Sequence, residues 1–263
     1  FSNVNIRKAI AKSIDPEEIT LIMASGALPA DSSGVKKAFL HFVTDEARAF
    51  DTGYDPQEAQ KMLLAEGYTL NRNGVLEKDG KELVFDLYVP TGWTDWITAA
   101  DVISDQLKQI GVRARVAQRA WPSPFMDNLR NGEYQMSFGY ATSGSHPFFQ
   151  FDNILHSRHY APVGTASNTH SQVRYKNPKV DAALETFKTL TDEQEELRTE
   201  TMATIVYEFM KDTPFVPLFF NPVWFQYNTK NFVGWPNADN PYVEPQFAGM
   251  GKMLILLNLQ PVK

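Results

Sequence analysis

The alternation of strands and helices over residues 83–140 constrains the fold of this chain more than any other feature of its sequence. Apolar residues follow one another at strand spacing in three ranges: 83–89, 112–118 and 134–140. Helical spacing over 97–110 predicts a helix between the first two strands, and a shorter helix over 125–129 precedes the third. This order is typical of a parallel sheet with right-handed crossovers.

Capping signals predict where the helices begin. An Asp or Asn directly before a proline supplies a side-chain acceptor at the N-cap and a proline at the first helical position. This pair occurs at Asp15-Pro16, Asp55-Pro56 and Asn177-Pro178. We expect Thr94 or Asp95 to cap the helix over 97–110. Thr191 and Gln194 form a capping box ahead of a further helix.

The C-terminal part of the chain is predicted to contain more strands. The range 215–221 is strongly apolar, and we expect it to join the strands over 83–140 in one mixed sheet. Beyond it, short apolar stretches alternate with Pro and Gly turns and end in the apolar run 253–257, which is one strand long. The range 141–175 lacks clear periodicity, and a loop of that length is usually functional or contains short elements.

Composition and missing motifs exclude several classes of function. The 31 acidic and 25 basic residues give a net charge of −6, which argues against nucleic acid as a partner. Cysteine is absent, so disulfides, thiolate metal sites and cysteine nucleophiles are excluded. Of the five histidines only His156 and His159 lie close in sequence, and no nucleotide-binding or hydrolase motif occurs. We therefore predict no metal, no cofactor and no catalytic residue.

Aromatic side chains occur where the predicted strands end. Trp93 follows the first strand, Trp121 follows the second, and Tyr140 ends the third. In an open parallel sheet, ligands bind beyond the carboxyl ends of the strands. The neighbouring residues are small and polar, which suits a closely approaching ligand, although tryptophans that cap the core are the alternative. For Trp96, one turn into the helix, the core is the simpler interpretation.

Four collinear stretches cover nearly the whole chain and carry further information. They are NVNIRKAIAKSID (3–15), YDPQEAQKMLLAEGY (54–68), RYKNPKVD (174–181) and TPFVPLFF (213–220). These stretches resemble the signatures VRxAL…AIDR, YDPEKAKKLLAEAGY, xYxNPEVD and APxIPLYY of the family 5 solute-binding proteins of ABC importers. Pro16 stands where that family usually has arginine, and a proline at the first helical position is harmless there.

The resemblance implies a fold and a domain organisation. The fold is a three-layer α/β lobe of the periplasmic-binding-protein-like type II class, with a mixed, mainly parallel sheet. Family members are about twice as long, and the matched signatures belong to their C-terminal half. Residues 1–222 are therefore expected to form the C-terminal lobe of a two-lobed receptor, and residues 223–263 to return to an N-terminal lobe outside this sequence.

The resemblance also implies a function and a location. The receptor would close on a small solute and deliver it to the transmembrane subunits of an ABC permease, without catalysis. It would be periplasmic or extracellular, and any lipid anchor would belong to the N-terminal part outside this sequence.

The segment after the third strand bears on the solute class. In the peptide-binding members this strand runs into W-x-x-D, whose aspartate pairs with the amino terminus of the peptide. Ser143 stands at that position here, and a desolvated ammonium without its charge partner is costly. The ranges 90–96 and 234–242 resemble segments of the cello- and manno-oligosaccharide receptors. We therefore expect an oligosaccharide ligand, with an oligopeptide as the alternative. The expected ligand-binding residues are Trp93, Trp121, Tyr140, Ser143, Trp235 and Asn237.

Two other classes stay open at this point. A glycoside hydrolase would need a pair of carboxylates, and the sequence singles out none. A transcription regulator can carry such a lobe as its sensor. No basic helix-turn-helix precedes the lobe in this sequence, and the N-terminal half outside it could hold one.

Overall fold

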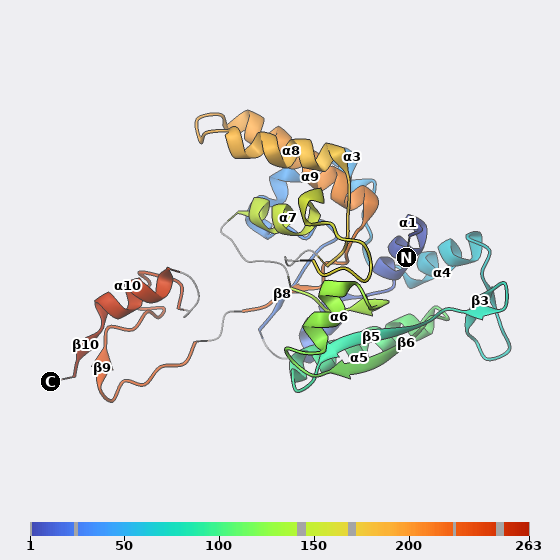
Figure 1. The fold of residues 1–263 in the computed structure, drawn as a ribbon, viewed down its shortest axis with the longest axis horizontal. Coiled ribbons are helices and arrows are strands. Elements are labelled where there is room, and N and C mark those ends of the chain that lie inside the picture. The colour runs from blue at the N-terminus through green and yellow to red at the C-terminus, as the bar shows by residue number, and fades with distance from the viewer. Residues whose placement is uncertain are drawn as a thin grey trace. The chain divides into compact units, whose positions relative to one another are not determined.

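The chain divides into two compact units, Phe1–Phe220 and Asn221–Lys263 (Figure 1). The computed structural model describes residues 2–23, 26–140, 146–167, 172–222, 225–245 and 250–262. All statements about contacts below concern these residues, taken within one unit at a time.

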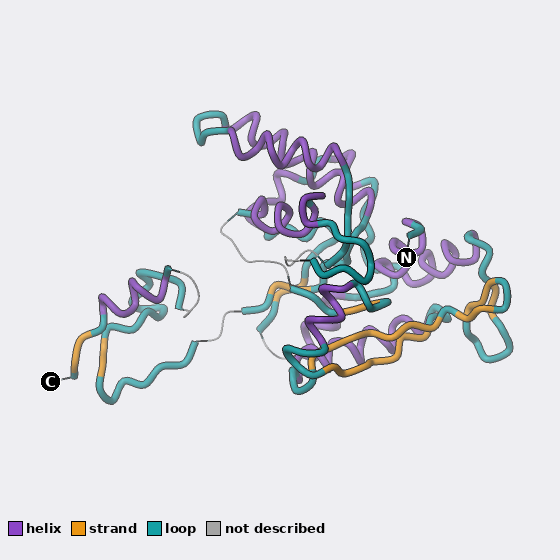
Figure 2. Tube along the Cα trace, viewed as in Figure 1, coloured by secondary structure: helices purple, strands orange, loops and turns teal. Residues whose placement is uncertain are grey.

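A three-stranded parallel sheet lies at the centre of one half of the first unit. Strand β5 (Val84–Pro90) lies between β6 (Arg113–Arg119) and β7 (Met136–Ser137). Figure 2 shows β5 and β6 running side by side along their whole length. The register places Leu87 beside both Val116 and Met136, so apolar side chains of neighbouring strands line up across the sheet. The predicted parallel sheet is confirmed.

Several helices share one apolar core with this sheet. They are α1 (Val4–Lys12), α2 (Pro16–Met23), α4 (Pro56–Ala65), α5 (Thr94–Gln109) and α6 (Phe125–Asn131). Helix α5 connects β5 to β6, and α6 connects β6 to β7, as the sequence predicts. Leu63, Leu107 and Phe125 are fully buried in the core, which we call the sheet core. Its apolar contacts provide most of the stability of this half.

A second core in the same unit is built mainly from helices. Its elements are η1 (Lys37–Phe42), α3 (Asp45–Arg48), α7 (Pro147–Leu155), α8 (Pro178–Thr189) and α9 (Glu195–Asp212). Phe151, Leu184 and Phe209 are fully buried in this helical core. In the range 141–175, where the sequence shows no periodicity, the described residues form helix α7 and the short helix η2 (Ser157–His159).

The apolar range 215–221 does not join the parallel sheet, so this part of the prediction is wrong. Its strand β8 (Phe219–Phe220) pairs antiparallel with β1 (Leu28–Pro29) in a separate two-stranded sheet. Pro214 and Pro217 lack the N–H groups that a central strand must donate, which restricts the segment to a short ladder. A further small sheet of the first unit contains β2 (Thr69–Leu70), β3 (Leu76–Lys78) and β4 (Lys81–Glu82).

The second unit contains a two-stranded sheet and a helix. Strand β9 (Phe232–Val233) pairs antiparallel with β10 (Gln260–Pro261). The run 253–257, which the sequence predicts as a strand, lies inside helix α10 (Gly251–Asn258), so that prediction is wrong. Leu and Met are good helix formers, and a short apolar run has no periodicity that separates a strand from a helix.

Three of the predicted helix caps are confirmed. Oδ1 of Asp15, Asp55 and Asn177 each accepts a backbone N–H of the first helical turn, at 2.9–3.0 Å. Two other predictions are wrong. Trp93, and not Thr94 or Asp95, is the N-cap residue of α5, and α9 begins after Gln194. Thr191 N donates to Gln194 Oε1 at 3.0 Å, so the capping-box pair closes a turn ahead of α9.

Arg7 connects the two cores through the end of α9. Its Nε donates to Thr213 O at 3.0 Å and its Nη2 to Asp212 O at 2.5 Å. These carbonyls end helix α9 and have no partner within the helix. Arg7 lies on α1, which packs in the sheet core, whereas α9 belongs to the helical core.

Side chains from the segment before α8 reach the same turn of α9. Tyr175 Oη donates to Asp212 Oδ2, and Asn177 Nδ2 donates to Glu208 Oε2 at 3.0 Å. Burial and the bond to Asp212 raise the pKa of Tyr175 above its usual value. Burial alone would raise the pKa of Glu208, but hydrogen bonds from Asn177 and Lys211 hold it below its usual value. We call Arg7, Tyr175, Asn177, Glu208 and Asp212 the α9 junction.

We predict that Arg7→Met lowers the free energy of unfolding by about 1.5–3 kcal/mol, because hydrogen bonds from a charged donor to the last α9 carbonyls are lost. Urea unfolding at neutral pH measures this difference. Arg48→Met, at an exposed position at the end of α3, is the matched control and should change stability by less than about 0.5 kcal/mol. Equal effects of the two variants would contradict a special role of Arg7.

The lowered pKa of Glu208 predicts a pH-dependent contribution to stability. Glu208 is 3% exposed, and its stabilising contribution is complete above the unfolded-state pKa of about 4.3. It is lost as the pH falls through the lower folded-state pKa. Glu208→Gln should therefore cost about 1–3 kcal/mol at pH 7 and progressively less towards pH 3. Urea unfolding across this pH range tests it, with exposed Glu200→Gln as the control; a difference that stays constant would show that Glu208 does not titrate as inferred.

Candidate functional site

Aromatic rings gather where β5 and β6 end. The ring centroids of Trp93 and Trp121 lie 5.0 Å apart, with their planes inclined by 40°. Trp93 meets Trp96 edge-on at 4.8 Å, and Trp96 continues to Phe138 at 5.4 Å. Trp121 also lies 6.0 Å from Phe125. These five residues form one chain of ring contacts, the aromatic cluster, which leads from the surface into the sheet core.

A tight turn directs Trp93 into this cluster. Gly92, after the end of β5, has φ +83°, a left-handed conformation that glycine adopts without steric cost. Trp93 N then donates back to Pro90 O at 3.3 Å, and Thr91 N donates to Arg119 O at 2.8 Å. The ends of β5 and β6 are thereby fixed side by side, and Trp93 and Trp121 follow from them.

The sequence-predicted residues of the first unit differ in exposure. Trp121 is 41% exposed and Tyr140 is 38% exposed, as expected for residues that face a ligand. Trp93 is only half-buried and packs against the sheet core, so it supports Trp121 as much as it lines a surface. Trp96 is 7% exposed, which confirms its interpretation as a core residue. Ser143 lies outside the described residues.

Trp235 and Asn237 belong to the second unit. Trp235 stacks on Tyr227 at 5.2 Å and donates from Nε1 to Phe232 O at 3.0 Å. Oδ1 of Asn237 accepts the backbone N–H groups of Asp239 and Asn240 at 2.9 and 3.0 Å. Within this unit both side chains therefore stabilise a turn, and their role in ligand binding stays a prediction.

The sequence reasoning missed one polar residue at the aromatic edge. Arg119 is the last residue of β6, and its Cζ lies 4.2 Å from the centroid of the Tyr88 ring. Its position two residues before Trp121, at the end of a predicted strand, was the available signal.

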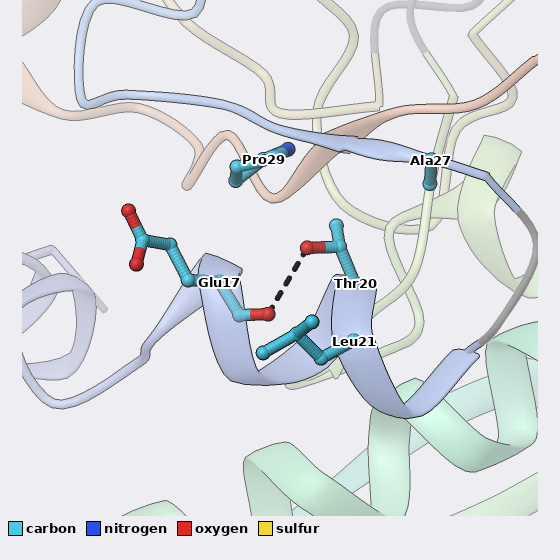
Figure 3. Close-up of a pocket in the computed structure, with 5 residues that line it drawn as sticks. All are labelled: Glu17, Thr20, Leu21, Ala27 and Pro29. Atoms are coloured by element: carbon cyan, nitrogen blue, oxygen red, sulfur yellow. Dashed lines mark hydrogen bonds between the residues drawn. The ribbon is translucent and has the colours of Figure 1, made fainter.

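A surface pocket of about 310 Å³ lies elsewhere, between α2 and β1 (Figure 3). It is lined by Glu17, Thr20, Leu21, Ala27 and Pro29. Thr20 Oγ1 donates to Glu17 O at 3.0 Å, and the neighbouring Leu21 is 81% exposed. None of the sequence-predicted binding residues lines this pocket.

The histidines among the described residues lie beside carboxylates or pack among aromatic rings. His156 Nε2 lies 2.7 Å from Glu185 Oε1, and its Nδ1 lies 3.4 Å from Asp181 Oδ1. Burial first, and then the positive charge of Arg198, lower the pKa of His146, whose ring stacks on Phe187 at 5.1 Å. Across the described ranges, no three histidines or carboxylates come together as a metal site would need. In the same ranges no helix has both the length and the apolar character needed to span a bilayer.

Comparison with known proteins identifies the family. Residues 1–162 match the family model of the bacterial extracellular solute-binding proteins, family 5 (middle). Because this match covers more than half of the chain, the chain belongs to that family. The oligopeptide-binding protein AppA of Bacillus subtilis is 24% identical over 225 residues, which cover 84% of this chain and 39% of AppA. The oligopeptide-binding protein OppA of Lactococcus lactis is 29% identical over 110 residues, 41% of this chain and 18% of OppA.

Solved structures share the fold. A periplasmic oligopeptide-binding protein of Thermotoga maritima, solved with bound mannohexaose, has a TM-score of 0.87 at 24% identity, covering 99% of this chain and 50% of that one. AppA of Bacillus subtilis, in complex with a nonapeptide, has a TM-score of 0.74 at 19% identity, covering 100% of this chain and 48% of that one. The α/β fold is thus that of the periplasmic binding proteins. The chain spans half or less of the length of these relatives.

We predict that Trp96→Ala and Trp121→Ala differ in their effect on stability. Trp96→Ala should lower the free energy of unfolding by about 3–5 kcal/mol, because it leaves a cavity in the sheet core. Trp121→Ala removes a ring that is already partly in water and should cost clearly less. Chemical denaturation of both variants measures the difference, and a loss at Trp121 as large as at Trp96 would make Trp121 a core residue.

Proposed function

We propose that this chain is part of the substrate-binding component of an ABC importer and binds an oligosaccharide. The observation that carries this proposal is the aromatic cluster, which presents the exposed ring of Trp121 beyond the carboxyl ends of β5 and β6. Ligands of open parallel sheets bind at this edge. An indole ring with a free face is suited to pack on the apolar face of a pyranose, with polar neighbours that bind its hydroxyl groups.

Family membership supports the role as a receptor. The relatives are named as binding proteins, and no catalytic motif occurs in the sequence. We infer that the protein is not an enzyme and that it delivers its solute to the transmembrane subunits of a permease. A periplasmic or extracellular location follows from the same family assignment.

The choice of oligosaccharide over peptide depends on two observations. By the resemblance to the peptide-binding members, Ser143 stands where they carry the aspartate that pairs with a peptide amine. The structural relative with the TM-score of 0.87 was solved with mannohexaose. The oligopeptide alternative is supported by the names of the curated relatives and by the nonapeptide in the AppA structure.

The two units suggest how the chain fits into a two-lobed receptor. We propose that residues 1–222 form the C-terminal lobe and that residues 223–263 return to an N-terminal lobe, so that the solute binds between the lobes. Helix α10 supports this arrangement, because it is apolar nearly all round and exposes Met253, Leu256 and Leu257. Any lipid anchor would belong to the N-terminal part of the protein.

Calorimetric titration of the full-length protein tests the solute class. We expect binding of manno- or cello-oligosaccharides and no comparable binding of peptides with a free amino terminus. Trp121→Ala should lower the binding free energy of the sugar by about 1–3 kcal/mol, because the stacking surface is lost. Trp93→Ala should have an effect of similar size but should also reduce stability, since Trp93 packs against the sheet core.

An exposed aromatic residue outside the cluster provides the control. Phe149→Ala on α7 removes an exposed ring from the helical part of the unit and should leave sugar affinity unchanged. Tight binding of free-amine peptides together with no binding of sugars would refute the oligosaccharide proposal and favour the alternative.

A further inference from the structure

Arg119 differs in its hydrogen-bond and ion-pair partners from the other half-buried arginines in the described part of the chain, which are Arg7, Arg174 and Arg198. Arg7 and Arg174 each donate to backbone carbonyls of distant segments. Arg198 donates to Leu190 O at 3.0 Å and lies 3.6 Å from a carboxylate oxygen. For Arg119, the hydrogen bond found in the described residues is to the carbonyl of its own neighbour Gln118, at 3.2 Å. Most of its N–H donors therefore remain available at the surface.

The position of the Arg119 guanidinium is nevertheless fixed. It stacks over the Tyr88 ring at 4.2 Å, and its backbone carbonyl accepts Thr91 N at 2.8 Å. Stacking occupies a face of the planar group and leaves its N–H donors at the edge free. Arg119 precedes Trp121 by two residues, so their Cα atoms are at most about 7 Å apart. A preorganised cation thus belongs to the residue two positions before the exposed Trp121 of the aromatic cluster.

A second arginine on the same strand shows how a carboxylate of the chain can neutralise such a group. Arg115 Nη2 lies 2.8 Å from Asp86 Oδ1, on the neighbouring strand β5. Arg119 has no carboxylate within 4.0 Å among the residues that the structure describes. The guanidinium fork matches a carboxylate with two parallel hydrogen bonds, and such charge-assisted bonds are stronger than neutral ones. A half-buried cation without an internal partner is suited to an external anion.

We propose that Arg119 is a specificity-determining residue that binds a carboxylate of the ligand next to the ring stacked on Trp121. The inference rests on the proposed function, because it takes the aromatic edge as the ligand site. It refines the ligand class to an oligosaccharide that contains a uronic acid. A peptide carboxylate offers the same chemistry, and the experiment below separates the two sources.

The experiment compares matched ligands by calorimetric titration of the full-length protein. The sugar pair is mannohexaose and the hexamer of β-mannuronate, which places a carboxylate on each ring. The peptide pair is an N-acetylated hexapeptide with a free carboxyl terminus and the same peptide amidated. The variants are Arg119→Gln, Arg119→Lys and, as the matched control on the same strand, Arg115→Gln.

We expect the mannuronate hexamer to bind at least about tenfold more tightly than mannohexaose at low salt. Arg119→Gln should abolish this preference while the affinity for mannohexaose stays within about threefold, and Arg119→Lys should retain part of it. Arg115→Gln should leave the preference intact. Added salt should reduce the preference in the unsubstituted protein, because the carboxylate contact is electrostatic and partly exposed.

The alternative outcomes separate this inference from the proposed function. If both hexamers bind equally well, the role of Arg119 is overturned and the oligosaccharide receptor stands. If neither sugar binds but the free-carboxyl peptide binds better than its amide in an Arg119-dependent way, carboxylate recognition stands and the oligosaccharide function is overturned. Failure of all four probes to bind overturns both.

Discussion

The first unit depends on how the last turn of α9 satisfies its backbone carbonyls. A helix end leaves acceptors without a partner, and burying them unpaired costs free energy. Arg7 supplies the donors from α1, which packs in the sheet core, whereas α9 packs in the helical core. Tyr175 and Asn177 reach the same turn from the segment that starts α8. The α9 junction therefore couples two apolar cores that would otherwise be free to pack independently.

This coupling explains the structural role of several residues in the family signatures. Arg7 lies in the first signature, Tyr175 and Asn177 in the third, and Thr213 begins the fourth. In the second signature, Asp55 caps α4. All of these residues maintain the fold, and none lies in the aromatic cluster. Family membership thus follows from structural residues, whereas the residues that we propose to bind the solute lie elsewhere, at the end of the parallel strands.

The sequence predicted those elements that local chemistry specifies. The strands β5 and β6 and the caps at Asp15, Asp55 and Asn177 depend on periodicity and on side-chain acceptors close in sequence. The pairing of β8 with β1 joins segments far apart in the chain, and no local pattern specifies it. For the candidate site, the predicted strand ends correctly indicated that Trp121 and Tyr140 lie at the surface. The half-burial of Trp93 and the stacking of Arg119 on Tyr88 depend on side-chain packing across strands, which the sequence does not display.

The aromatic edge combines two physical properties that a binding surface needs. Trp121 is exposed, yet Trp93 and Phe125 support its ring from the core side, so little conformational freedom remains to be lost when a ligand stacks on it. Arg119 is held by Tyr88 in the same way, and its free donors are already oriented. Both groups are anchored in the sheet while their functional surfaces stay unpaired. If the proposed site is right, a flat apolar face and a fixed cation on the same edge of the sheet would select ligands that offer both a ring face and an anion, and the core behind them would supply the rigidity for that selection.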